Sequence, residues 1–247
     1  MNQILKKAKS IHKRLKNGFQ VAFFPENFYV YQKDLHHYHR LSYSQEGEDL
    51  ILSRFFEGKN KGFYVDVGAH HPQRFSNTYY FYLQGWRGIN IDAMPGSMDI
   101  FLKTRSNDIN LEFPIADSKQ ILTYYKFNEP ALNGFSEEMS KPRNGLNQYK
   151  IISKQELETY TLTEVLDKYL PQNQTIDFLT VDVEGLDYQV LKSNNWKKYR
   201  PRLVLAEDLS VSSLNGIDES LVTSFMYEQN YQLYAKSVNT LFFVTKI

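Results

Sequence analysis

The sequence contains no cysteine among its 247 residues. Disulfide bonds, catalytic thiolates and zinc sites made of cysteine are therefore excluded. The absence of cysteine also fits a reducing compartment, so we expect a cytoplasmic location. No run of 18 apolar residues is present, which leaves no candidate for a transmembrane helix. The first residues lack the apolar core and the small-residue cleavage site of a secretion signal.

An excess of one charge is also missing, because 29 basic side chains are balanced by 28 acidic ones. A net charge of +1 gives no general attraction to phosphates, so we expect no nucleic-acid partner. Basic residues gather only in the first 42 residues, which we interpret as an N-terminal extension. Its apolar residues fall at helical spacing, which permits peripheral membrane contact. A solvated helix or a frayed end explains the same pattern more simply.

Apolar residues make up 42% of the chain, enough for one sizeable core over residues 43–247. Apolar strands alternate with helical patterns in this part of the sequence. The predicted strands lie at 62–67, 87–92, 109–115, 177–185 and 202–208, followed by a hairpin formed from 231–236 and 240–245. This order predicts a doubly wound, Rossmann-like α/β sheet that is mostly parallel, with an antiparallel C-terminal hairpin.

The segment between residues 121 and 156 departs from this pattern. Residues 121–127 alternate as an exposed or antiparallel strand does. Residues 128–156 are polar and carry several prolines, glycines and asparagines, so we expect an irregular lid or substrate loop. Tyr, Asn and Ser side chains in and next to this loop suit a polyol, and they include Tyr124, Asn133 and Ser136.

Two of the predicted strands have endings that suit a nucleoside. The first ends in Asp66-Val67-Gly68, where glycine lets a ligand approach the backbone closely. The second ends in Asp92, and a carboxylate at this place can accept both hydroxyls of a ribose. The alternative is that Asp66 and Gly68 only cap a strand. The pairing of the two endings favours a nucleoside at the carboxyl edge of the sheet.

The residues after Gly68 argue against a dinucleotide. A pyrophosphate needs a glycine-rich turn with free backbone N–H groups, whereas Gly68 is followed by Ala69, His70, His71 and Pro72. Proline has no N–H to donate. S-adenosylmethionine has no phosphate and needs a ribose acceptor, an apolar adenine slot and acceptors for its amino group. Asp66 and Asp92 fit these needs better than they fit NAD.

Further acidic residues follow other strands of the predicted sheet. They are Asp117, Asp182, Glu184, Glu207 and Asp208. Because like charges at one sheet edge repel, we expect a cation to offset them. A sulfonium with its ammonium group would do so, and so would a divalent metal at Asp182, Glu207 and Asp208. Nothing in the spacing demands a metal, so we predict no metal site.

Four segments in register resemble the FkbM-type S-adenosylmethionine-dependent methyltransferases, whose sheet is that of the class I methyltransferases. The resemblance runs from about Tyr43 to the C-terminus. Its segments are Tyr43–Asp49, Phe63–His70, Gly85–Asp92 and Asp177–Gly185. The third glycine of the broader class is absent here. The resemblance implies O-methylation of a hydroxyl on a sugar, a glycan or a small natural product.

The resemblance also implies roles for individual residues. Asp66, Gly68, Ala69 and His70 would lie near the methionine portion and the ribose, and Asp92 would hold the ribose hydroxyls. Asp117 would approach the adenine edge. Asp182 would contact the cofactor beside the transferring methyl, together with Glu184.

An alcohol is a poor nucleophile and needs a group that takes its proton. We predict Asp182 and Glu184 at the reacting hydroxyl, with His71 as a third candidate because histidine has a suitable ordinary pKa. The alternative is that these carboxylates only orient backbone or cofactor, and that positioning alone drives transfer.

Two other functions remain open at this point. A nucleotide-sugar enzyme would need a pyrophosphate cradle or a basic clamp, and neither is evident. A catalytically inactive adenosyl-binding scaffold would not need the intact acidic strand endings. A nucleic-acid methyltransferase is disfavoured, because the acidic segment Asp182–Gly185 would repel phosphates.

Overall fold

The computed structural model describes residues 40–246. The predicted N-terminal extension, residues 1–42, therefore lies almost wholly outside the described residues. The helices, 3-10 helices and strands follow one another along the chain as α3 (Glu48–Phe55), β1 (Phe63–Val67), α4 (Tyr79–Leu83), β2 (Arg87–Asp92), α5 (Met98–Thr104), β3 (Ile109–Glu112), β4 (Ile121–Phe127), η1 (Pro130–Leu132), α6 (Glu137–Arg143), β5 (Ile151–Glu158), α7 (Leu162–Tyr169), β6 (Phe178–Val181), α8 (Asp187–Lys192), β7 (Leu203–Glu207), η2 (Leu214–Glu219), α9 (Leu221–Glu228), β8 (Tyr231–Lys236) and β9 (Thr240–Thr245).

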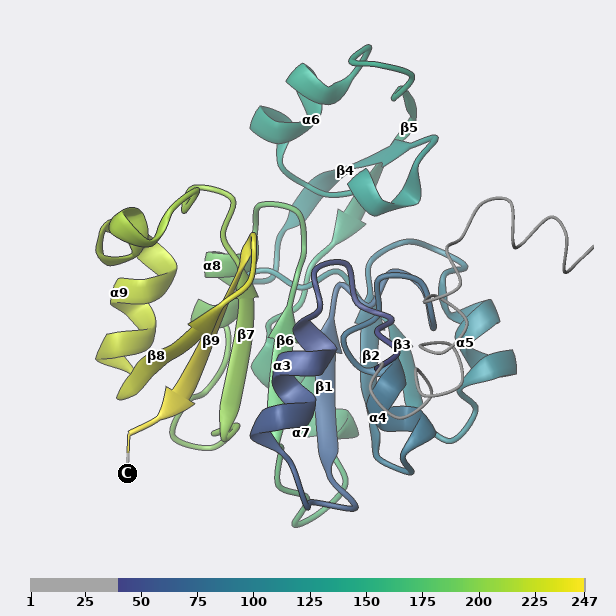
Figure 1. Ribbon diagram of the computed structural model, residues 1–247. Helices are drawn as coiled ribbons and strands as arrows, with labels where there is room; N and C mark the ends of the chain where they lie inside the picture. The colour runs from purple at the N-terminus through teal and green to yellow at the C-terminus, as the bar shows by residue number, and fades with distance from the viewer. Residues whose placement is uncertain (1–39, 247) are drawn as a thin grey trace, which may run out of the picture. The chain divides into compact units, whose positions relative to one another are not determined.

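Seven strands form one sheet in the order β3-β2-β1-β6-β7-β9-β8. The pairs from β3 to β7 are parallel, whereas β9 runs antiparallel to both β7 and β8. This arrangement confirms the predicted mostly parallel sheet with its C-terminal hairpin. All five parallel strands end at the same edge, which is the upper edge in Figure 1. Chain order reverses between β1 and β6, and sheets of this kind bind ligands at such a point.

Alternation of side chains along the strands builds a separate core on each face of the sheet. In β1, Val65 and Val67 join the larger core, which also contains buried residues of α7, α8 and α9. Tyr64 points to the opposite face and joins an aromatic core with residues of α3 and α4. Both faces are therefore covered by helices, which agrees with the burial of every residue of β1 and β6.

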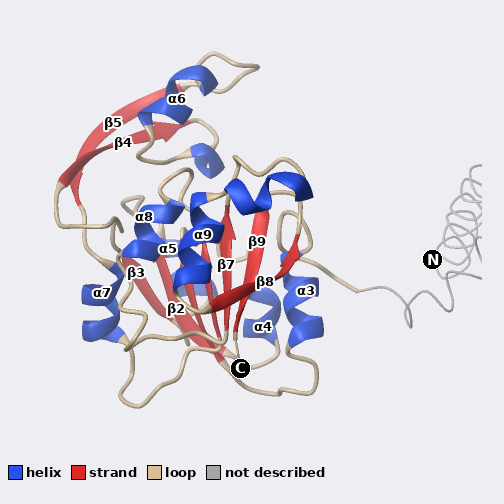
Figure 2. Cartoon of the chain, turned by 90° about the vertical axis from the view of Figure 1, so that its left-hand side faces the viewer, coloured by secondary structure: helices blue, strands red, loops and turns tan. Residues whose placement is uncertain are grey.

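An insertion between β3 and α7 stands over the carboxyl edge of the sheet (Figure 2). Its frame is a two-stranded antiparallel ribbon of β4 and β5, and η1 and α6 lie between the two strands. The prediction that residues 128–156 are irregular was wrong here, because α6 and most of β5 fall inside that range. The strand β5 escaped prediction because the ribbon is solvated, so its exposed positions carry polar residues in place of an apolar alternation.

No helix between residues 40 and 246 combines the length and the apolar run that crossing a membrane requires.

Candidate functional site

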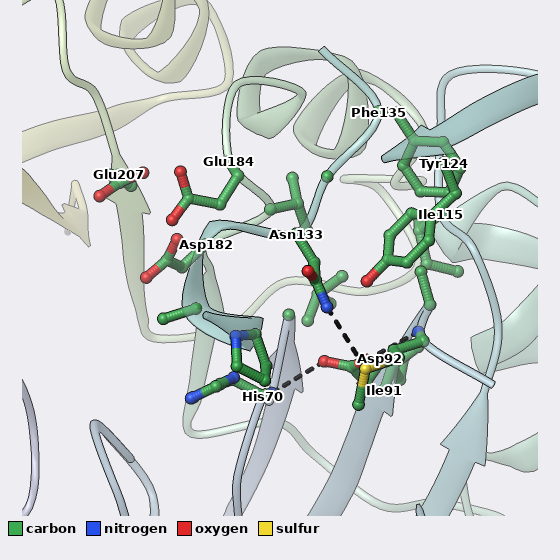
Figure 3. A pocket seen from close by; sticks show the side chains of 18 of the residues that line it. His70, Ile91, Asp92, Ile115, Tyr124, Asn133, Phe135, Asp182, Glu184 and Glu207 are labelled. Carbon is green, nitrogen blue, oxygen red and sulfur yellow. Dashed lines mark hydrogen bonds between the residues drawn. The ribbon is translucent and has the colours of Figure 1, made fainter. Parts of the chain in front are cut away.

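A cavity opens at the carboxyl ends of β1, β2, β6 and β7, beneath the insertion. This main cavity has a volume of about 890 Å³, with the solvent at its mouth included. Figure 3 shows that its side chains come from two walls of the sheet and from the insertion. We call them the β1–β2 wall, which contains Gly68, His70 and Asp92, and the β6–β7 wall, which contains Asp182, Glu184 and Glu207.

The β1–β2 wall is tied together by backbone hydrogen bonds. The N–H groups of Gly68 and Ala69 both donate to the carbonyl oxygen of Ile91, at 2.9 and 3.0 Å. Each oxygen of Asp92 accepts one backbone N–H, from His70 at 2.9 Å and from Met94 at 2.8 Å. Burial raises the pKa of Asp92, and these two hydrogen bonds oppose the shift. The carboxylate is thus held firmly, and each oxygen keeps a lone pair for a further donor.

Gly68 joins the two walls. Its φ is +87°, and a Cβ atom at this position would lie 1.7 Å from the carbonyl oxygen of Asp182. Only glycine fits such a close approach of two backbones. The N–H of Asp182 in turn donates to the carbonyl of Val67 at 3.0 Å, so the ends of β1 and β6 are locked in place.

The β6–β7 wall brings together three carboxylates, which we call the carboxylate cluster. Oxygens of Asp182, Glu184 and Glu207 lie within 4.8 Å of one another. Arg143 of α6 forms an ion pair with Glu184 at 2.5 Å. Burial and then the charge of neighbouring carboxylates raise the pKa of Glu207 to about 8. Asp182 keeps part of its surface open to solvent, but the protein that encloses its carboxylate and the charges of Glu207, Asp187 and Glu184 raise its pKa in the same direction. Crowding of like charges therefore distinguishes this wall.

The loop that carries Glu184 is shaped by Asp187, a buried residue at the start of α8. Its carboxylate accepts the N–H groups of Val183 at 3.1 Å and of Gly185 at 3.2 Å. Burial raises the pKa of Asp187 to about 7. The two hydrogen bonds hold the turn that directs Glu184 toward the main cavity.

Backbone strain is concentrated around the main cavity. His70, Phe75 and Glu184 line it, and their φ angles are +51°, +58° and +55°. Such angles cost a residue other than glycine about 1 kcal/mol or more. The remaining non-glycine residues with positive φ in the described part are asparagines, which tolerate it: Asn147, Asn173 and Asn230. Strained positions of this kind gather at functional sites.

The insertion and the neighbouring strand ends supply an apolar slot. Its side chains are Ile91, Phe113, Ile115, Tyr124 and Phe135. Asn133 stands beside them, and its side-chain oxygen accepts the N–H of Phe127 at 2.7 Å. The prediction that this segment lies at the site rested on its Tyr and Asn residues, and Figure 3 shows Tyr124 and Asn133 facing the cavity.

Four of the predicted site residues do not line the main cavity. Asp66 points to the other face of the sheet, where its carboxylate accepts a hydrogen bond from Thr78 Oγ1 at 2.8 Å. Burial raises the pKa of Asp66 to about 6 in spite of the nearby Arg105. Arg105, which was not predicted as a functional residue, is fully buried; it donates a hydrogen bond to Thr78 Oγ1 and forms an ion pair with Asp108.

The other three residues differ in their surroundings. Ala69 is buried against Met98 and Phe101. The Nδ1 atom of His71 accepts the N–H groups of Gln73 and Arg74, at 3.1 and 3.0 Å, within its own loop. Asp117 lies 3.9 Å from Lys192. Of the predicted set, the structure brings Gly68, His70, Asp92, Asp182 and Glu184 to one cavity, and it adds Glu207.

A second cavity, which we call the side cavity, shares Glu207 with the main cavity. It is bordered by Met139 of α6, by Asp187 and Tyr188 of α8, by Leu221 of α9, and by Asp208 in the loop after β7. The carboxylate of Asp208 accepts the hydroxyls of Ser210 and Ser220, each at 2.5 Å. The side cavity therefore combines apolar surface with oxygen acceptors.

The carboxylate cluster has oxygens close enough to share a divalent cation. Carboxylates also gather in this way without a metal, and an offsetting positive charge can come from an organic cation. We assign no metal to the cluster.

The lining of the main cavity fits the predicted cofactor. Two buried polar atoms on its walls, His70 Nε2 and Glu207 Oε2, have no hydrogen-bond partner among residues 40–246. Burial lowers the pKa of His70 to about 4, so its imidazole is neutral. The cavity thus has a firmly held carboxylate at one end, an apolar slot, and an anionic cluster at the other end. A ribose, an adenine ring and a sulfonium require these three features.

Comparison with known proteins identifies the family. The model of the "Methyltransferase FkbM domain" matches residues 66–233, more than half of the chain. A solved structure of a TehB-like SAM-dependent methyltransferase from Corynebacterium glutamicum ATCC 13032 Kitasato is 11% identical, with 90% of this chain and 97% of that chain covered and a TM-score of 0.39. This likeness is too distant to carry an argument. No curated protein matches the chain. On the family match, the chain belongs to the FkbM methyltransferases and is an S-adenosylmethionine-dependent methyltransferase.

Proposed function

We propose that this methyltransferase acts on a hydroxyl group of a sugar, a glycan or a small natural product. The observation that carries the proposal is the carboxylate cluster at the end of β6 and β7, because an alcohol must lose its proton as it is methylated. A neutral amine has a free lone pair and can attack without first losing a proton, so it has less need of a base than an alcohol has. Residues 43–247 form the methyltransferase domain in this proposal.

The cofactor-binding roles divide between the two walls. Asp92 accepts the ribose hydroxyls with the lone pairs that its backbone partners leave free. The apolar slot holds the adenine ring, and His70 Nε2 offers a neutral polar contact for the methionine portion. Gly68 contributes by its lack of a side chain, whereas Asp66 acts indirectly, through Thr78 and the buried Arg105.

The bound cofactor supplies an electrophilic methyl carbon on a sulfonium. Asp182 takes the proton of the acceptor hydroxyl, because its side chain lies at the end of β6 next to the cavity. Its raised pKa makes it a stronger base than an ordinary aspartate once it is ionised. Glu184 is held by Arg143 and orients the hydroxyl. The insertion stands over this end of the main cavity.

The acceptor is expected to be uncharged or cationic. The side cavity next to Glu207 is bordered by carboxylates and by apolar side chains such as Leu221 and Val222. A phosphate or a uronic acid would be repelled there, whereas hydroxyls can donate to the carboxylate oxygens. A neutral sugar or an amino sugar with an apolar face matches this lining.

The proposal is tested with S-adenosylmethionine that carries an isotopic label in its methyl group and with a panel of sugars, glycans and small alcohols. We expect label on an ether oxygen of the product, identified by mass spectrometry and NMR. Asp182→Asn should lower turnover by at least 100-fold and leave the affinity for S-adenosylhomocysteine within threefold. Asp167→Asn, at an exposed carboxylate of α7 paired with Lys198, is the matched control and should retain activity. Label on nitrogen or carbon, or full activity of Asp182→Asn, would contradict the proposal.

A further inference from the structure

The carboxylates of Asp182 and Glu207 lie in a surplus of negative charge. The charged groups that act on them come from several elements: Glu46 before α3, Glu48 at its start, Glu184 in the loop after β6, Asp187 at the start of α8, and Arg143 of α6. Asp208 and Glu219 add further carboxylates around the side cavity. Arg143 is the one cation in this set, and it is paired with Glu184. Arg143 therefore offsets only part of the negative charge that the described residues place around Asp182 and Glu207.

Glu207 responds to this surplus in a specific way. Its Oε2 atom is buried and has no hydrogen-bond partner within the described part of the chain. Burial, followed by the charges of Asp187 and Glu184, raises its pKa to about 8. The shift is toward the neutral form, so the ligand-free protein keeps a proton on this pair of carboxylates at pH 7.

We propose that Asp182 and Glu207 form a proton-holding pair that distinguishes the charged cofactor from its neutral product. The pair loses its proton to solvent when a sulfonium occupies the neighbouring end of the cavity, and it keeps the proton when a thioether is there. S-adenosylmethionine and S-adenosylhomocysteine differ by one methyl group and one positive charge. The pair therefore favours entry of the first and departure of the second.

The proton count closes over one turnover. Binding of the cofactor releases one proton from the pair to solvent. During transfer the acceptor O–H bond breaks, the O–CH₃ bond forms, the S–CH₃ bond breaks with its electrons left on sulfur, and the pair takes the hydroxyl proton. The neutral thioether and the reprotonated pair then have no charge attraction between them. This inference rests on the proposed function, because it places the methyl-transfer end of the cofactor at β6 and β7.

Calorimetry of the full chain tests the inference without an acceptor. S-adenosylmethionine and S-adenosylhomocysteine are titrated at pH 7 in buffers of different ionisation enthalpy, which gives the number of protons released. We expect close to one proton for S-adenosylmethionine and close to none for S-adenosylhomocysteine. Between pH 6 and 7.5 the affinity for the first should rise about tenfold per pH unit relative to the second.

Variants assign the proton to the pair. Glu207→Gln keeps the shape of the side chain and cannot ionise, so the two ligands should release equal numbers of protons and their affinity ratio should not change with pH. Asp92→Asn is the control, since it should weaken both ligands and leave the difference in proton number intact. If Glu207→Gln does not fold, Asp182→Asn is measured in its place. The difference in proton release between the two ligands on wild-type protein tests the inference without any variant.

Equal proton release by the two ligands on wild-type protein would overturn the inference, and so would a difference that survives in Glu207→Gln. The proposed function fails separately, when labelled methyl reaches no hydroxyl although the proton difference is present. A wild-type protein that binds neither ligand would overturn both.

Discussion

Asp92 and Glu207 stand at the same edge of the same sheet, yet their surroundings differ. Both oxygens of Asp92 accept backbone N–H groups, so the carboxylate is fixed before any ligand arrives. One oxygen of Glu207 is buried with no hydrogen-bond partner in the described part of the chain, and further carboxylates crowd around it. We propose that the difference separates two tasks: the β1–β2 wall is preorganised to hold a ligand, whereas the carboxylates of the β6–β7 wall need a cation or a proton to offset their charge.

The largest expected effect comes from the residue that joins the two walls. Gly68→Ala places a Cβ atom 1.7 Å from the carbonyl of Asp182 at a φ of +87°. We expect a loss of about 3 kcal/mol or more in the free energy of unfolding, measured by urea denaturation. Gly58→Ala is the matched control, because it has a φ of +81° and no atom within 4 Å of the added Cβ. It should cost about 1 kcal/mol, and equal losses in the two variants would contradict this role of Gly68.

The next effect tests the preorganised wall. Asp92→Asn replaces a carboxylate oxygen by an amide nitrogen, which cannot accept a backbone N–H and a ribose hydroxyl. We expect the dissociation constant of S-adenosylhomocysteine to rise about 30-fold, since hydrogen bonds to charged groups contribute roughly 1.5–3 kcal/mol. Asp117→Asn should change it less than twofold, because Asp117 lies outside the main cavity and near Lys192. If Asp117→Asn raised the dissociation constant more than Asp92→Asn, the result would favour the sequence-based prediction that adenine lies near Asp117.

Because carboxylates crowd on the β6–β7 wall, we expect the stability of the ligand-free protein to depend on pH. The pKa of Glu207 is raised from 4.5 to about 8 in the folded chain. The folded state then binds more protons than the unfolded state between these pH values. The contribution of protonated Glu207 to the free energy of unfolding is therefore complete below pH 4.5 and is lost as the pH rises through 8. The free energy of unfolding should fall by on the order of 1–2 kcal/mol less in Glu207→Gln than in the wild type between pH 5 and 8.5, measured by thermal and urea unfolding.

The control for that series is Glu156→Gln on the exposed face of β5, which should leave the pH profile unchanged. Asp182 and Asp187 have pKa values raised in the same direction, so part of the decline should remain in Glu207→Gln. An unaltered profile in Glu207→Gln would show that the proton resides elsewhere.

The smallest expected effect concerns the contact between the β1–β2 wall and the insertion. Arg74, in the loop after β1, pairs with Glu129 at 2.8 Å, and the two side chains are 44% and 31% exposed. Exposed pairs of this kind contribute about 0.5 kcal/mol. Arg74→Ala should therefore lower the affinity for S-adenosylhomocysteine two- to threefold at low salt, and this loss of affinity should be smaller at 1 M salt. Lys141→Ala, which breaks a pair within α6, should have no effect on binding.

Much of the fold was predictable because apolar strands and helices alternate along most of the chain. The strand β5 was not, because its solvated position removes the apolar pattern on which prediction depends. Asp92 could be placed by its position at a strand end. Asp66 could not, because β1 is buried on both faces and its alternation does not say which face receives the ligand.

On each wall of the site, some features could not be predicted from the sequence. His71 was favoured for the pKa that histidine ordinarily has, but its Nδ1 atom is occupied within its own loop. Glu207 was recognised as an acidic strand ending, yet its proximity to Asp182 and Glu184 depends on β6 and β7 being neighbours and on the turn that Asp187 holds. Contacts between loops from separate strands are a property of the folded chain alone.

We propose that the cofactor lies across both walls, with its ribose at Asp92 and its sulfur toward the carboxylate cluster. A crystal structure of the protein with S-adenosylhomocysteine would show this placement. We expect ribose hydroxyls within hydrogen-bond distance of Asp92 and a sulfur atom that faces Asp182 and Glu207. A ligand bound in the reverse direction, or outside the main cavity, would contradict it.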